Sequence, residues 1–162
     1  MGVTYAKGTE VSLLDPVELG EQIVAVVQEA IPWLEGLTEE QANQTEKEGQ
    51  WNAKEIIGHL ADSAVNNLAR IVRLQYEDNP NLPGYDQNAW VKLQCYSERL
   101  WPEMLALWLT LNEHLASAVR HIDRAAFARE GTVAGGELTL GFLIEDYIAH
   151  MEHHLRALKQ LL

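Results

Sequence analysis

The chain has 162 residues, of which 47% are hydrophobic, and a formal net charge of -12; this length suffices for one domain with a substantial core. The acidic balance argues against nucleic acid and anionic membrane surfaces as partners, because phosphate binding needs a basic surface. No apolar run approaches the ~18 residues of a membrane span, and the first residues lack the apolar stretch of a secretory signal. Cys95 is the only cysteine. We therefore expect a single cytoplasmic domain over residues 1–162, without an intramolecular disulfide.

Four long stretches carry the three- and four-residue spacing of apolar side chains that is typical of amphipathic helices. The expected helices are, in chain order, Pro16 to Leu34 behind a capping Asp15, Asn52 to Tyr76, Ser97 to Ile122 with Ser97 as the cap, and Thr139 to Leu161. Because strand signals are few, the sequence predicts an all-α protein with a four-helix bundle.

The connections between these stretches differ in character. Residues 36–50 are polar and have room for one short helical turn, whereas NPNLPG at 79–84 must end the second helix. Residues 85–96 are too apolar for an idle linker, so we expect them to pack on the bundle, with Cys95 as a packing residue. Glycines in residues 127–137 allow a loop or a small hairpin.

Histidines carry most of the functional information. His150 and His154 stand four residues apart, so on a helix they project from one face, one turn apart. A third imidazole from another helix would complete a metal site with a position free for water or substrate, as in catalytic centres. Such ligands suit zinc, nickel, cobalt or iron, with zinc as the default. A half-buried histidine pair without any metal explains the HxxxH spacing alone more simply.

A polar stripe runs along the second predicted helix at three- and four-residue spacing. It consists of His59, Ser63, Asn66 and Arg70, with Asp62 beside it. The stripe lies nearly opposite the apolar one, so periodicity alone predicts a solvent-exposed face. The alternative is a polar row that lines a cleft, with His59 at a metal and Asn66 or Arg70 in contact with substrate. Asp62 and Asp146 lie within a turn of His59 and His150 and could accept the second N–H of such ligands.

Three separated motifs resemble one known family, the DinB-like (YfiT-like) superfamily of metal-dependent enzymes. WNAKEIIGHLADS at 51–63, followed by Asn66, Asn67 and Arg70, resembles its second-helix signature. YDQNAWV at 85–91 resembles the loop before its third helix, and HMEHH at 150–154 resembles its fourth-helix motif. The resemblance covers roughly Trp51 to the end of the chain, with the motifs in the family's order.

This resemblance implies a four-helix bundle with a long connection between its second and third helices, often as a homodimer. It implies His59, His150 and His154 as ligands of a divalent metal, with zinc or nickel as the expected ion. Relatives include transferases and an isomerase that use a metal-activated low-molecular-weight thiol, and others described as metal-dependent hydrolases. The sequence departs from the family where many relatives have glutamate after the Asp-Ser pair, because Ala64 and Val65 follow Ser63 here.

Three hypotheses follow for a small-molecule substrate. The first is a metal-dependent transferase that acts through an exogenous thiol, in which Arg70 orients an anionic group and no protein cysteine is required. The second is a hydrolase in which Asp62 acts as general base and His153 as a proton shuttle. The third is a non-catalytic dimeric bundle that binds a metal or a small ligand. We expect the first, with Asp62, Asn66 and Arg70 as the catalytic candidates.

Overall fold

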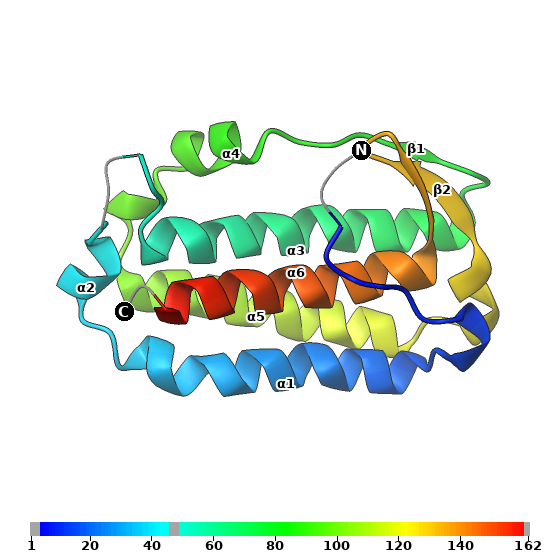
Figure 1. Cartoon of the computed structure of the whole chain (residues 1–162), viewed down its shortest axis with the longest axis horizontal. Coiled ribbons are helices and arrows are strands. Elements are labelled where there is room, and N and C mark those ends of the chain that lie inside the picture. The colour runs from blue at the N-terminus through cyan, green and yellow to red at the C-terminus, as the bar shows by residue number, and fades with distance from the viewer. Residues whose placement is uncertain (1–3, 46–48, 161–162) are drawn as a thin grey trace.

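The computed structural model describes residues 4–45 and 49–160, and it consists mainly of helices (Figure 1). The helices are α1 (Pro16–Glu35), α2 (Glu39–Asn43), α3 (Ala53–Tyr76), α4 (Gln87–Leu93), α5 (Trp101–Arg120) and α6 (Leu140–Gln160), and the strands are β1 (Asn81–Leu82), β2 (Glu130–Val133) and β3 (Gly136–Thr139). The four long helices α1, α3, α5 and α6 are those that the sequence predicts. The predicted last residue, Leu161, lies outside the described residues.

The long helices form a four-helix bundle in which α5 packs against α1 and α3, and α6 packs against the same two helices. Figure 1 shows that α3 and α5 run in the same direction, opposite to α1 and α6. Two consecutive long helices can be parallel only if their connection crosses the length of the bundle. Residues 77–100 make this crossing, so the predicted long connection between the second and third long helices is confirmed.

Side-chain caps set the starts of the first two long helices, because the first N–H groups of a helix have no partner within it. Asp15 accepts hydrogen bonds from the N–H groups of Val17 and Glu18, ahead of a proline at the first helical position. Asn52 and Glu55 form a reciprocal capping box at the start of α3. Both starts agree with the sequence prediction.

The start of α5 differs from the prediction, which placed a cap at Ser97. Helix α5 begins at Trp101, and Ser97 instead lies in a 3-10 turn, where its hydroxyl accepts a hydrogen bond from Asn52 at 3.1 Å. A helix that began at Ser97 would hold Pro102 beyond its first turn, where the proline ring clashes with the preceding turn. In the absence of a side-chain cap at Leu100, the carboxylate of Glu39 accepts the N–H of Trp101 at 2.8 Å.

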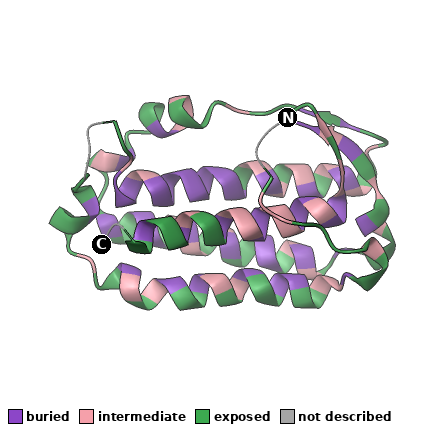
Figure 2. Cartoon of the chain, in the orientation of Figure 1, coloured by how far each residue is buried: buried purple, intermediate pink, exposed green. Residues whose placement is uncertain are grey.

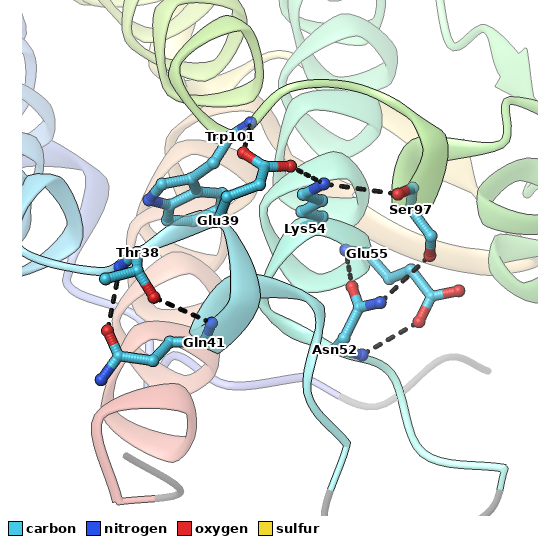
Figure 3. A network of polar contacts seen from close by, with 8 residues as sticks. All are labelled: Thr38, Glu39, Gln41, Asn52, Lys54, Glu55, Ser97 and Trp101. Carbon is cyan, nitrogen blue, oxygen red and sulfur yellow. Dashed lines mark hydrogen bonds and ion pairs between the residues drawn. The ribbon is translucent and has the colours of Figure 1, made fainter.

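A buried lysine joins these pieces at one end of the bundle (Figure 3). The side chain of Lys54 is only 2% exposed, and its ammonium group pairs with the carboxylate of Glu39 and donates to the carbonyl of Ser97 at 3.3 Å. The other oxygen of Glu39 is the one that accepts the N–H of Trp101. A buried charge must be paired to be tolerated, so this network fixes α2, α3 and the start of α5 relative to one another.

The crossing segment covers the outer face of α3. Tyr96 is buried against Gly58, where a Cβ atom would lie only 2.1 Å from the ring, so the close approach requires a glycine. Helix α4 packs on the same face, with Val91 buried. As Figure 2 shows, the first half of α3 is therefore buried on nearly all sides. The expectation that residues 85–96 pack on the bundle is confirmed, except that Cys95, expected to pack, is exposed.

Three short strands close the other end of the bundle (Figure 1). Strands β2 and β3 form the small hairpin that the glycines allowed, with Gly131 opposite Leu138. Its two-residue turn has positive φ at Ala134 and Gly135, as a tight hairpin requires. Strand β1, which sequence patterning did not predict, pairs in parallel with β2 over two residues. Within the described residues, no helix is both long and apolar enough to cross a membrane.

Candidate metal centre

Three histidines from two helices converge where α3 faces α6. His59 of α3 and His150 and His154 of α6 each offer a ring nitrogen, and these atoms lie within 4.8 Å of one another. The Nε2 atoms of His59 and His150 are 3.2 Å apart. Two nitrogens at 2.0–2.1 Å from one tetrahedral ion stand about 3.3 Å apart. The spacing of the histidines therefore fits a single divalent ion shared between the two helices.

The protonation states of these histidines also favour the binding of a metal cation. Burial, and then the neighbouring imidazoles, lower the pKa of His59 to about 4 and that of His150 to about 3. The same two causes lower the pKa of His154 to about 4. At neutral pH all three rings are thus uncharged, which is the form in which imidazole binds a metal. His59 is only 1% exposed, so bulk water does not surround its ring.

The partners of the outer ring nitrogens differ from the expected carboxylates. The Nδ1 atom of His150 lies 3.5 Å from the hydroxyl of Ser63, which can accept its N–H when the lone pair on Nε2 is free to bind a metal. The Nδ1 atom of His59 is buried and has no hydrogen-bond partner among the described residues. Asp62 and Asp146 do not accept a hydrogen bond from either histidine in the described part of the chain. The indole ring of Trp51 packs on His59, with the ring centroids 5.0 Å apart.

Asp62 is engaged elsewhere. Its Oδ1 atom accepts hydrogen bonds from the hydroxyl of Tyr96 and the amide of Gln94, both at 2.6 Å. Its Oδ2 atom has no partner among the described residues. Burial raises the pKa of Asp62, and the two donated hydrogen bonds only partly oppose this shift. Asp62 therefore lies behind the histidines, against the crossing segment.

A cavity of about 570 Å³ extends from the histidines along α3 toward the sheet. Its wall on α3 consists of His59, Ser63, Asn67 and Arg70. Other walls come from α6, from the β2–β3 hairpin and from the crossing segment, with Phe142, Leu143, Tyr147, His150, Val133, Leu138 and Tyr85 among them. The cavity is large enough for a small organic molecule.

The polar stripe of α3 thus forms a wall of the cavity and not a solvent-exposed face. One of its members differs from the prediction. Asn66, a candidate substrate contact, is not on the cavity wall, and its amide donates to the backbone carbonyl of Asp62 at 2.8 Å. Its neighbour Asn67 takes that place and donates to the hydroxyl of Ser63 at 3.2 Å. Asn67 belongs to the motif on which the resemblance rests, but periodicity favoured Asn66 because it aligns better with His59 and Arg70.

The N-terminal segment adds an aromatic wall that no sequence pattern indicated. The ring centroid of Tyr5 lies 5.1 Å from that of His150 and 5.0 Å from that of His153. The carboxylate of Asp146 holds this segment by accepting the N–H groups of Tyr5 and Ala6, the latter at 2.9 Å. Glu145 accepts the N–H of Thr9 in the same way, at 2.9 Å. Two neighbouring carboxylates of α6 therefore hold the N-terminal segment in place.

The remaining histidines stay outside the centre. His153 is exposed and is not part of the cluster, although its ring centroid lies 5.4 Å from that of His154. His114 on α5 and His121 directly after it are exposed. The Nδ1 atom of His121 lies 2.7 Å from the carbonyl oxygen of Ser117.

Comparison with known proteins gives consistent matches. A family model described as the DinB superfamily matches residues 22–158. A proposed metal-dependent hydrolase of Oceanobacillus iheyensis is 29% identical over 126 residues, which cover 77% of this chain and 73% of that protein. A protein of Geobacillus kaustophilus with the same proposed activity is 30% identical over 123 residues, covering 74% and 68%. The structure of YfiT from Bacillus subtilis, described as a probable metal-dependent hydrolase with an unusual four-helix bundle topology, matches with a TM-score of 0.76 at 24% identity, covering 90% of this chain and 83% of that one.

Proposed function

Because the chain belongs to the DinB superfamily, we propose that it is a metal-dependent enzyme whose divalent ion is held by His59, His150 and His154. The observation that carries the proposal is the convergence of three uncharged imidazoles, two of which, His59 and His150, line a cavity. Zinc or nickel is the expected ion, because both bind imidazole nitrogens readily. When bound, such an ion would lower the pKa of a coordinated thiol or water molecule toward neutrality.

We propose that the nucleophile is an exogenous low-molecular-weight thiol, so that the enzyme is a transferase. The position of Asp62 supports this choice, because the expected general base is bonded to Tyr96 and Gln94 behind the histidines. Ala64 and Val65, which follow the Asp-Ser pair, supply no acid either. A free thiol has a pKa of about 8.5 and gives up its proton far more easily than water does. With Asp62 engaged and no acid after Ser63, the site therefore suits a thiol better than water.

Hydrolysis is the second candidate, and the proposed activities of the relatives favour it. The carboxylates of Glu137 and Asp146 line the cavity and are the groups through which a proton could leave. Asp146 is partly committed, because one of its oxygens holds the N-terminal segment. In either reaction the chain's own groups have the same tasks: Ser63 orients His150, while the rings of Tyr5 and Trp51 limit the access of water to the histidines.

The first test is the metal content of the purified protein, measured by plasma mass spectrometry. We expect about one equivalent in the parent protein, and its loss in His59→Ala and His154→Ala. His153→Ala is the matched control, because this exposed neighbour should leave the metal content unchanged. No bound metal after loading with zinc and nickel would overturn the proposal.

The second test separates the two reactions. Transfer of a thiol to 1-chloro-2,4-dinitrobenzene and hydrolysis of p-nitrophenyl acetate are measured on the metal-loaded protein, with and without cysteine as the thiol. Turnover that requires the thiol supports the transferase, and turnover that is independent of it supports the hydrolase. We also propose, from the family resemblance, that the protein is a homodimer, which sedimentation velocity tests directly.

A further inference from the structure

Arg70 is a half-buried cation on the wall of the same cavity that His59 and His150 line. Its guanidinium group donates to Asn67 Oδ1 at 3.4 Å and to the carbonyl of Pro83 at 3.1 Å. Since a guanidinium has five N–H donors, these contacts leave most of them free. Tyr85 lies beneath it, with the ring centroid 5.9 Å from the guanidinium carbon.

No carboxylate in the described part of the chain lies within ion-pair distance of Arg70. Arg73, one turn further along α3, has the ordinary arrangement, because it pairs with Glu77 at 2.6 Å on the outside of the bundle. Burial lowers the pKa of Arg70, although a guanidinium stays charged at any pH of interest. Glu137 and Asp146 also line the cavity, but neither lies within ion-pair distance of Arg70. A half-buried cation without an ion-pair partner favours an anionic ligand beside it.

Geometry sets the distance between this cation and the histidines. His59 and Arg70 are separated by three turns of α3 and share one face, about 16 Å apart along the helix axis. Between them, Asn67 and Ser63 form a polar line on the cavity wall that reaches His150. The other walls carry the carboxylates of Glu137 and Asp146 and several apolar side chains, among them Val133, Leu138, Phe142 and Leu143.

We propose that the cavity binds an elongated small molecule whose anionic group, a carboxylate or a phosphate, is held by Arg70 while its other end reaches the histidines. The inference rests on the proposed function for what happens at the histidine end, but the anion site itself depends only on Arg70. The planar fork of a guanidinium binds either anion through two hydrogen bonds. A short anion such as acetate would bind at one end only, so the two-ended arrangement selects for ligand length.

A chain-length series tests this proposal. ω-Mercaptoalkanoates with two to ten methylene groups are titrated into the cobalt-loaded protein, and binding is followed by the near-ultraviolet absorption of the cobalt–thiolate pair. Uncharged ω-mercaptoalkanols of the same lengths are the controls, and ω-mercaptoalkyl phosphonates distinguish a phosphate-type ligand from a carboxylate. We expect an affinity optimum at intermediate length for the anions and none for the alcohols.

Two variants test whether Arg70 is the residue that binds the anionic group. Arg70→Gln should weaken binding of the best anion about tenfold to hundredfold, as expected for the loss of hydrogen bonds to a charged group. Arg73→Gln, on the same helix but outside the cavity, should leave the affinity unchanged. Equal affinities for anions and alcohols, or equal binding by the parent and Arg70→Gln, would overturn the proposal.

A parallel titration keeps this inference separate from the proposed function. Octanoate and octanol are titrated into the metal-free protein by calorimetry, where neither ligand depends on a metal. Preferential binding of octanoate that Arg70→Gln abolishes would support the anion site even if no metal binds. Equal binding of the two ligands would count against the anion site even if the metal centre is real.

Discussion

Replacement of Gly58 by alanine should destabilise the protein when Tyr96 is present and stabilise it when Tyr96 has also been replaced by alanine. A Cβ atom at position 58 would lie 2.1 Å from Cδ2 of Tyr96 and 2.4 Å from Cγ and Cε2, far inside contact distance. Tyr96 is 3% exposed and its hydroxyl donates to the buried carboxylate of Asp62. The ring therefore cannot move away without breaking this bond or displacing the crossing segment.

The magnitude follows from three contributions. Overpacking costs about 1–3 kcal/mol, and loss of a hydrogen bond to a charged group costs a further ~1.5–3 kcal/mol. Alanine offsets roughly 1 kcal/mol of this, because glycine is the poorer helix former in the interior of α3. We expect Gly58→Ala to lower the free energy of unfolding by about 1.5–5 kcal/mol. In the Tyr96→Ala background, where the ring is absent, the same substitution should raise it by roughly 1 kcal/mol.

Urea unfolding followed by circular dichroism measures both effects in a double-mutant cycle. The parent, Gly58→Ala, Tyr96→Ala and the double variant are compared at one pH and one metal concentration. The reasoning is refuted if Gly58→Ala destabilises both backgrounds by the same amount. That result would mean that the helix itself, and not the ring of Tyr96, requires glycine at this position.

Three further predictions concern the site and its surroundings. In the folded protein the pKa values of His59, His150 and His154 lie below the ordinary value of about 6.5, so below that pH the unfolded metal-free chain binds more protons than the folded one. The free energy of unfolding, measured by urea titration, should therefore be at its full value above pH 6.5 and fall toward pH 4. A free energy of unfolding that does not change over this pH range would contradict the prediction. Tyr147→Phe leaves the buried Asn112 without its hydroxyl partner and should cost about 1–3 kcal/mol in the free energy of unfolding, with no loss in urea midpoint as the contrary result. Tyr5→Ala should speed the transfer of bound metal to a chelator several-fold while Tyr76→Ala, an exposed tyrosine, leaves it unchanged; equal rates would show that the ring does not shield the histidines.

The sequence by itself determined the four long helices. Apolar periodicity, the caps at Asp15 and Asn52 and the breaks at the prolines located the four long helices to within a few residues, because these signals act over one or two turns. The same local geometry placed His150 and His154 on one face of α6. It failed at Ser97, where the position of Pro102 outweighed a favourable capping residue.

Whether the stripe of His59, Ser63 and Arg70 meets water or a cavity was not decided by local geometry. By periodicity the stripe belongs to the outside of α3, and in the structure His59 and Ser63 are 1% and 3% exposed. The difference arises because α6 packs on this part of α3, with His150 next to both His59 and Ser63, and because Trp51 packs on the ring of His59. Which imidazoles meet, which asparagine lines the cavity and where Tyr5 lies depend on contacts between segments far apart in the chain. Local periodicity carries no information on such contacts, so only the tertiary structure decided them.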